Sequence, residues 1–99
     1  MTNSVAIVMG SKSDMALAEA TKEVLDGYGI GSVIKVLSAH RTPEALKEFI
    51  ENTIKDGTKV FVGIAGLAAH LSGNIAAHTT LPVIGIPGDG GPLNGLDAL

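Results

Sequence analysis

Four short apolar runs, each followed by a turn or a stretch with helical spacing, constrain the fold more than any other feature of this chain. Residues 5–9 are apolar at every position, as in a strand buried on both faces of a sheet. The other runs span residues 33–37, which are rich in β-branched residues and include Lys35, and residues 60–64 and 81–87, and a proline closes the last one. Strands that alternate with helices across short loops predict an α/β domain, with a parallel sheet and helices on both faces.

The segments between these runs predict three helices. In the first, we expect either Ser13 or Asp14 to be the N-cap, and the second begins with Thr42 and a first-turn proline. An alanine-rich third helix is expected from about residue 68 to residue 77. Apolar residues at three- and four-residue spacing predict the buried faces of the first two helices: Leu17, Ala20, Val24, Leu25 and Tyr28, then Leu46, Phe49, Ile50 and Ile54.

Size and composition limit the classes of function. A chain of 99 residues buries one small core with little surplus stability, so assembly into a homo-oligomer would help it. The net charge of −3 and the lack of a basic patch argue against nucleic acid as a partner. With no cysteine, no signal peptide and no apolar run long enough to cross a membrane, we expect a cytoplasmic protein.

The end of the chain carries an unfinished pattern. Leu93, Leu96 and Leu99 begin a helical apolar pattern that stops with the sequence. Amphipathic helices normally continue for several turns, so we expect that these leucines are covered by further C-terminal sequence or by a partner chain.

The loop after the first strand has the residues of a ligand site. Gly10 permits close backbone approach, and Ser11, Ser13 and the amides at the start of the helix can hold a phosphate or a sugar hydroxyl. A carboxylate at Asp14 repels phosphate but accepts hydrogen bonds from ribose hydroxyls. The alternative is that Ser13 and Asp14 only cap the helix.

The loops after the second and third strands add chemistry at the same edge of the sheet, where open α/β sheets bind ligands. After Ser38, the His40 imidazole can donate and accept protons, and the Arg41 guanidinium fits phosphate or carboxylate. Alternatively, His40 is a surface residue and Arg41 pairs with a helix acid such as Glu44. The small residues from 63 to 70 suit a flat ligand, although His70 by itself suggests a structural histidine.

Metal and nucleophilic chemistry are disfavoured. The histidines lack a carboxylate or cysteine to complete a metal site, and no serine has a nucleophile-elbow pattern around it. We therefore expect no metal. The histidines considered as metal ligands are His40, His70 and His78, and the serines considered as nucleophiles are Ser11, Ser13 and Ser38.

Four collinear motifs resemble the PurE family of purine biosynthesis: residues 5–14, 38–43, 65–71 and 81–85. The resemblance implies a flavodoxin-like three-layer α/β/α domain with a parallel sheet, four of whose strands are visible here. It also implies that residues 1–99 form one domain that lacks the family's usual C-terminal part. Family members assemble as octamers with active sites at subunit junctions and use no metal or organic cofactor.

The same resemblance implies a reaction on a small ribonucleotide. Bacterial-type members interconvert N5-carboxyaminoimidazole ribonucleotide (N5-CAIR) and 4-carboxyaminoimidazole ribonucleotide (CAIR), whereas animal-type members carboxylate aminoimidazole ribonucleotide (AIR) with free CO2. Arg41 favours the mutase class, because animal-type members tend to carry lysine there. Three alternatives remain: the AIR carboxylase, a carboxylase of another heteroaromatic nucleotide, and a catalytically silent nucleotide-binding fragment or paralogue.

The resemblance also implies roles for individual residues. His40 matches the general acid/base of the family. Leu67 and Ser72 depart from the family, many of whose members have glycine and proline there. The matching substrate-binding residues are Ser11, Ser13, Asp14, Ser38 and Arg41 for the nucleotide, and Gly66, Ala69, His70 and Leu71 for the carboxylate and CO2 pocket.

Overall fold

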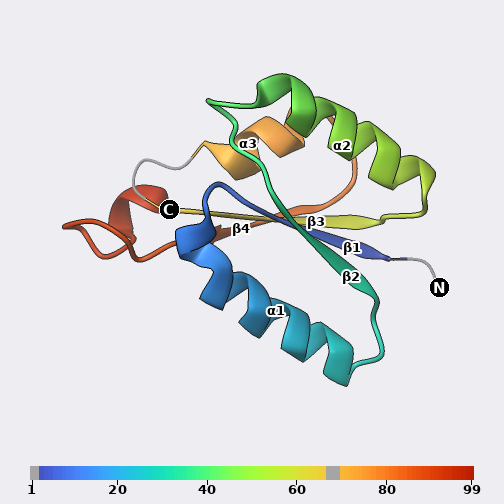
Figure 1. Ribbon diagram of the computed structural model, residues 1–99, viewed down its shortest axis with the longest axis horizontal. Helices are drawn as coiled ribbons and strands as arrows, with labels where there is room; N and C mark the ends of the chain where they lie inside the picture. Colours follow the sequence, from blue (N-terminus) through green and yellow to red (C-terminus); the bar gives the residue numbers. More distant parts are fainter. Residues whose placement is uncertain (1–2, 67–69) are drawn as a thin grey trace.

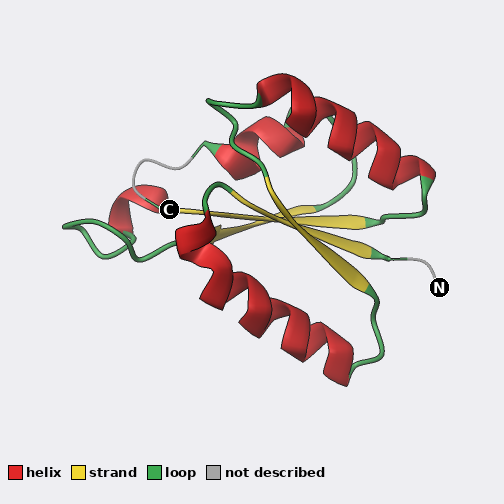
Figure 2. Cartoon of the chain, viewed as in Figure 1, coloured by secondary structure: helices red, strands yellow, loops and turns green. Residues whose placement is uncertain are grey.

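The computed structural model describes residues 3–66 and 70–99 and shows three layers (Figure 1). Helix α1 covers one face of a parallel sheet, and α2 and α3 cover the other (Figure 2). The strand order β2-β1-β3-β4 is that of a doubly wound sheet, so the predicted flavodoxin-like fold is confirmed. The elements are β1 (Val5–Met9), α1 (Met15–Gly27), β2 (Ser32–Val36), α2 (Pro43–Lys55), β3 (Val60–Ala65), α3 (Leu71–Ala76) and β4 (Val83–Pro87).

Strand β1 is buried on both faces, as its unbroken apolar run predicts. It pairs in parallel with β2 on one side and with β3 on the other, and all five of its residues are buried. Ala6 and Val8 point into the core beneath α2 and α3, whereas Ile7 and Met9 point into the core beneath α1. The chain thus builds two small cores on one central strand.

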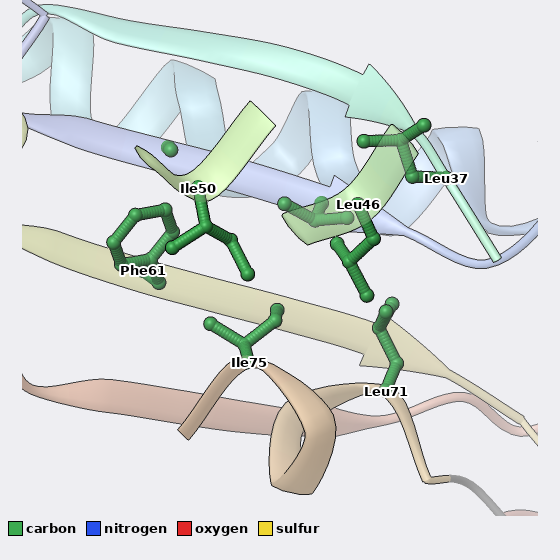
Figure 3. Close-up of a cluster of buried hydrophobic side chains, with 8 residues drawn as sticks. Leu37, Leu46, Ile50, Phe61, Leu71 and Ile75 are labelled. Carbon is green, nitrogen blue, oxygen red and sulfur yellow. The ribbon is translucent and has the colours of Figure 1, made fainter. Parts of the chain in front are cut away.

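The core beneath α2 and α3 holds the largest buried side chain, Phe61 of β3 (Figure 3). Leu46 and Ile50 reach it from α2, as their spacing predicts, and Leu71 and Ile75 reach it from α3. Phe49 is partly buried beside this core, whereas Ile54, which was also predicted on the buried face, is 36% exposed in the last turn of α2. The packing of the other residues fixes where the loops at the helix ends lie.

The predicted buried face of α1 is wrong in part. Val24 is 61% exposed and Tyr28 is 80% exposed, whereas Ala18 is fully buried. The stripe that faces the sheet includes Lys22, whose ammonium donates to the backbone and hydroxyl oxygens of the buried Ser32. Because Lys22 interrupts the apolar residues of this stripe, the three- and four-residue spacing in the sequence predicts that a neighbouring face of α1 is buried, rather than the face that packs on the sheet.

The third helix is shorter than predicted. It begins at Leu71, with His70 at the N-cap position, and Ala77 follows its last residue. The predicted start near residue 68 lies outside the described residues. Gly63 and Gly85 are partners in adjacent strands, and a Cβ on Gly63 would lie 3.1 Å from the Ser72 Cα. These two glycines let the first turn of α3 lie directly on the sheet.

The C-terminal segment forms only a short turn of helix. Strand β4 begins at Val83 rather than residue 81, and after it residues 88–95 form a loop. A single 3-10 turn, η2 (Leu96–Ala98), follows. Leu93, Leu96 and Leu99 are 54%, 69% and 87% exposed, so the part of the chain that the structure describes does not cover them.

Candidate functional site

Loops that follow all four strands meet in one cleft of about 350 Å³ at the carboxyl edge of the sheet. Eight residues predicted for the site line it, and Arg41 touches its rim through Gly10. Ala69 lies outside the described residues. The predicted residues in the cleft are Ser11, Ser13, Asp14, Ser38, His40, Gly66, His70 and Leu71, and they are joined by Gly10, Ala39, Ala65, Gly90 and Gly91.

In the first loop, Asp14, one of the two predicted N-cap residues, is confirmed at that position. A 3-10 turn, η1 (Lys12–Asp14), precedes α1, and the Ser11 hydroxyl accepts from the Ser13 amide as the cap of that turn. The Ser11 and Ser13 hydroxyls also bond to each other. Asp14 occupies the N-cap position of α1 without a side-chain cap bond. The interpretation that Ser13 and Asp14 only cap the helix therefore fails, and their side chains are available to the cleft.

Asp14 lies in a setting that disfavours its charge. Burial, and to a smaller extent the nearby charge of Asp89, raise the pKa of the Asp14 carboxyl above 3.8. Its Oδ1 would lie 2.9 Å from a Cβ on Gly88, so the carboxylate abuts the loop that follows β4. A ligand that donates hydrogen bonds would stabilise the charged form.

We expect Asp14→Asn to raise the stability of the free protein at pH 7. Because the folded-state pKa is raised, the ionised carboxylate costs stability, and this cost appears as pH rises from about 3.8 through the raised pKa. Below that window both states are protonated and the gain should vanish. Denaturant unfolding of both proteins between pH 3 and pH 7 measures this, and a gain that stays constant with pH would contradict it.

The second loop is held by hydroxyl groups at both ends. The Ser38 hydroxyl accepts from the His40 amide at 3.2 Å and the Arg41 amide at 3.1 Å. The Thr42 hydroxyl accepts from the Ser38 amide at 3.0 Å and donates to the Ser38 carbonyl at 3.2 Å. Arg41 donates from Nη2 to the Gly10 carbonyl at 3.3 Å. Arg41 thus joins the first two loops and makes no ion pair with Glu44.

Ser38→Ala should loosen this loop, whereas Ser38→Thr keeps the hydroxyl. Removing an oxygen that accepts from two backbone amides should cost about 1–2 kcal/mol of unfolding free energy. Hydrogen exchange at the His40 and Arg41 amides, together with denaturant unfolding, measures the effect. Equal losses in the alanine and threonine variants would show that the hydroxyl does not hold the loop.

The third loop brings a second imidazole to the first. His70 Nδ1 lies 3.3 Å from His40 Nε2, and the two rings meet edge to face with centroids 5.2 Å apart. One ring must donate and the other accept, so each ring constrains the tautomer of the other. His78 lies at the other end of α3, where its Nδ1 contacts the Asn74 carbonyl. Within residues 3–66 and 70–99, no three histidine, aspartate or glutamate side chains gather as metal ligands.

Gly90 and Gly91 are the cleft residues that sequence reasoning missed. Their signal was a glycine-rich loop directly after a strand, in the same position as the three loops that were identified. The fold and the cleft define an α/β protein with a candidate ligand site at the carboxyl edge of its sheet.

Comparison with known proteins assigns the family. Residues 4–99 match the family described as AIR carboxylase, and the chain belongs to it. It is 50% identical over its whole length to a probable N5-carboxyaminoimidazole ribonucleotide mutase of Methanobrevibacter smithii, of which it covers 29%. It is 48% identical over 98 residues to the N5-carboxyaminoimidazole ribonucleotide mutase of Haemophilus influenzae. The aligned residues cover 99% of this chain and 60% of that relative.

Solved structures agree with this assignment. Treponema denticola PurE is similar with a TM-score of 0.84 and 33% identity, over 94% of this chain and 60% of that one. Its PurE2-S38D form is similar with a TM-score of 0.89 and 32% identity, over 98% of this chain and 62% of that one. The chain therefore spans about 60% of the length of these structures. No helix among its described residues is long and apolar enough to cross a membrane.

Proposed function

We propose that this chain binds an aminoimidazole ribonucleotide and interconverts N5-CAIR and CAIR in purine biosynthesis. The observation that carries the proposal is the His40 imidazole in the cleft, on a loop fixed by Ser38 and beside His70. The relatives named N5-carboxyaminoimidazole ribonucleotide mutase, at 44–50% identity, support the same reaction.

The reaction needs one group that can both give and take a proton. In N5-CAIR the bond between the exocyclic nitrogen and the carboxyl carbon breaks, which releases CO2 while the nitrogen takes up a proton. A new bond then forms between ring carbon C4 and CO2, and the C4 proton leaves. His40 is the proposed donor to the nitrogen and the proposed acceptor of the C4 proton: the imidazolium becomes neutral in the first step and is regenerated in the second, so the cycle consumes no net proton.

The remaining residues have binding and shielding roles in this proposal. The Ser11 and Ser13 hydroxyls and the Arg41 guanidinium suit the phosphate, with Ser38 supporting that loop, and Asp14 suits the ribose hydroxyls. Gly66, His70 and Leu71 line the cleft beside His40, where they would exclude water and retain CO2. Assembly into a homo-octamer and a cytoplasmic location stay predictions.

A catalytically silent nucleotide-binding protein is the second candidate, because the residues that line the cleft can hold a ribonucleotide without any turnover. Three absorbance assays separate the candidates. The mutase converts N5-CAIR to CAIR without bicarbonate, the carboxylase converts AIR only when bicarbonate is added, and the silent protein does neither.

If the chain is silent, the same assay on a fusion with the C-terminal segment of the Haemophilus relative distinguishes an incomplete enzyme from a protein without this activity. Turnover by the fusion indicates an incomplete enzyme, and silence of both contradicts the mutase proposal.

A further inference from the structure

Asn94 and Gly95 form a tight turn at the end of the loop that follows β4. Asn94 has a φ of +52°, and Gly95 has a φ of +90° with a ψ of −7°. The Leu96 amide donates to the Leu93 carbonyl at 3.1 Å and closes the turn. Two positive φ angles inside such a bond define a type I′ turn, for which Asn-Gly is a preferred pair. The pair therefore has a structural reason to be here, and the proposed chemistry does not use it.

The same pair is chemically reactive. The amide nitrogen of the residue that follows an asparagine can attack the side-chain carbonyl carbon and close a succinimide ring, and glycine has no Cβ to obstruct this attack. Asn94-Gly95 is the only Asn-Gly pair in the sequence. Serine, threonine and isoleucine follow the other asparagines, which are Asn3, Asn52 and Asn74. The sequence thus singles out Asn94 among its asparagines.

The structure leaves the reacting groups of this pair accessible. Asn94 is exposed, so water reaches its side-chain amide. The Gly95 amide donates to no backbone carbonyl among residues 3–66 and 70–99, so no backbone hydrogen bond there holds the proton that the nitrogen must lose. Asn52 and Asn74 lie inside α2 and α3, where the helical hydrogen bonds hold the backbone. We therefore expect Asn94 to react ahead of these two.

Gly95 also connects the turn to the cleft. A Cβ on Gly95 would lie 3.0 Å from the Gly88 carbonyl oxygen. A Cβ on Gly88 would in turn lie 3.1 Å from the Gly66 amide nitrogen and 2.9 Å from the Asp14 Oδ1. Both Gly66 and Asp14 line the cleft. These groups are packed so closely that a displacement of Gly95 is passed to Gly88 and from there to the cleft.

We propose that Asn94 is a site of spontaneous deamidation, and that the isoaspartate formed there changes the shape of the cleft through Gly88. The inference is independent of which ligand the cleft binds. In the first step, the Gly95 nitrogen bonds to the Asn94 Cγ and gives up its proton, while the bond from Cγ to the side-chain nitrogen breaks and ammonia leaves. In the second step, water opens the ring at one of its two carbonyl carbons, which needs no oxidant or reductant.

The two directions of ring opening have different consequences. Opening at Cγ gives aspartate and keeps the backbone, whereas opening at the backbone carbonyl of residue 94 gives isoaspartate. In isoaspartate the chain runs through the former side chain and is one carbon longer, so the turn between Leu93 and Leu96 cannot keep its geometry. The longer backbone shifts Gly95 relative to Gly88, and both products add a negative charge to the loop.

The test ages the purified chain at mildly alkaline pH and follows residue 94 by peptide mass spectrometry. Each conversion raises the mass by one dalton, and protein isoaspartate methyltransferase labels the isoaspartate product. The three Asp-Gly pairs of the chain can also form isoaspartate, but without a change in mass. Asn94→Gln is the control, because its side-chain carbonyl lies one methylene farther from the backbone, and the mass gain at position 94 should be lost. Amide NMR of the aged wild type should show shifted signals for Gly66 and Gly88 that a fresh sample lacks.

The outcomes are distinct. Mass gain and label at residue 94, ahead of Asn3, Asn52 and Asn74, support the proposal even if Asn94→Gln does not fold. A wild type that stays unmodified at residue 94, during the time in which a synthetic peptide of residues 91–98 converts, overturns it, and so does equal gain at every asparagine. Modification without shifts at Gly66 and Gly88 overturns the effect on the cleft. None of these outcomes bears on the mutase reaction, which the absorbance assays test separately.

Discussion

His40→Asn should remove conversion of N5-CAIR to CAIR while leaving AIR binding within about threefold of wild type. General acid/base groups contribute about 10²- to 10⁴-fold to rate, and asparagine cannot take up the C4 proton at neutral pH. Binding should survive because the His40 contact to Ser38 is made by its backbone amide, which the variant keeps. Absorbance kinetics gives the turnover, and calorimetric titration with AIR gives the affinity.

His78→Asn is the matched control for this variant. His78 lies outside the cleft, at the C-terminal end of α3, so its loss should not change turnover. Both measurements use the form of the chain that shows turnover, alone or with the C-terminal extension. A His40→Asn protein that retains a tenth or more of wild-type turnover would assign the proton transfer to another group, with His70 the nearest candidate.

Phe61→Ala should lower the free energy of unfolding by about 3–5 kcal/mol, the largest stability effect expected from a single substitution here. Phe61 is fully buried on β3 and belongs to the core beneath α2 and α3 (Figure 3). Removing its ring leaves a cavity that the surrounding helices cannot fill. A domain of this size lies toward the low end of the usual range of about 5–15 kcal/mol, so this loss should remove a large part of its stability. Denaturant unfolding followed by circular dichroism measures the loss.

Val24→Ala provides the contrast. Val24 is 61% exposed on α1, so its replacement should change the free energy of unfolding by no more than about 0.5 kcal/mol. Alanine also has the higher helix propensity, which offsets the small loss of apolar contact. If Val24→Ala costs as much as Phe61→Ala, the face of α1 that packs on the sheet has been misassigned.

These two substitutions mark what the sequence could predict of the fold. Strand β1 was predictable residue by residue, because a strand buried on both faces is apolar at every position. The buried face of α1 was not, because Lys22 lies on it and satisfies its ammonium group at Ser32 across the loop to β2. That pairing depends on tertiary geometry, which helical periodicity does not encode.

The same distinction holds for the site. The positions of Ser11, Ser38 and His40 at one edge followed from strand order, since parallel strands place their following loops together. The contact between His40 and His70 was not predictable, because it depends on Gly63 and Gly85 letting α3 lie close to the sheet. Gly90 and Gly91 carry no reactive side chain, so only their place in the cleft reveals them.

The most direct test of the central claim, that four loops form one nucleotide site, is an amide NMR titration of this chain with AIR. We expect the shifted amides to belong to residues 10–14, 38–41, 65–66, 70–71 and 90–91, with a common dissociation constant. A cavity of about 540 Å³ beside the C-terminal end of α2 is lined by Asn52, Asp56 and Thr58, shares no residue with the cleft, and provides an internal control that should not respond. Shifts concentrated at those three residues, or no saturable shift at all, would show that the four loops do not form a nucleotide site.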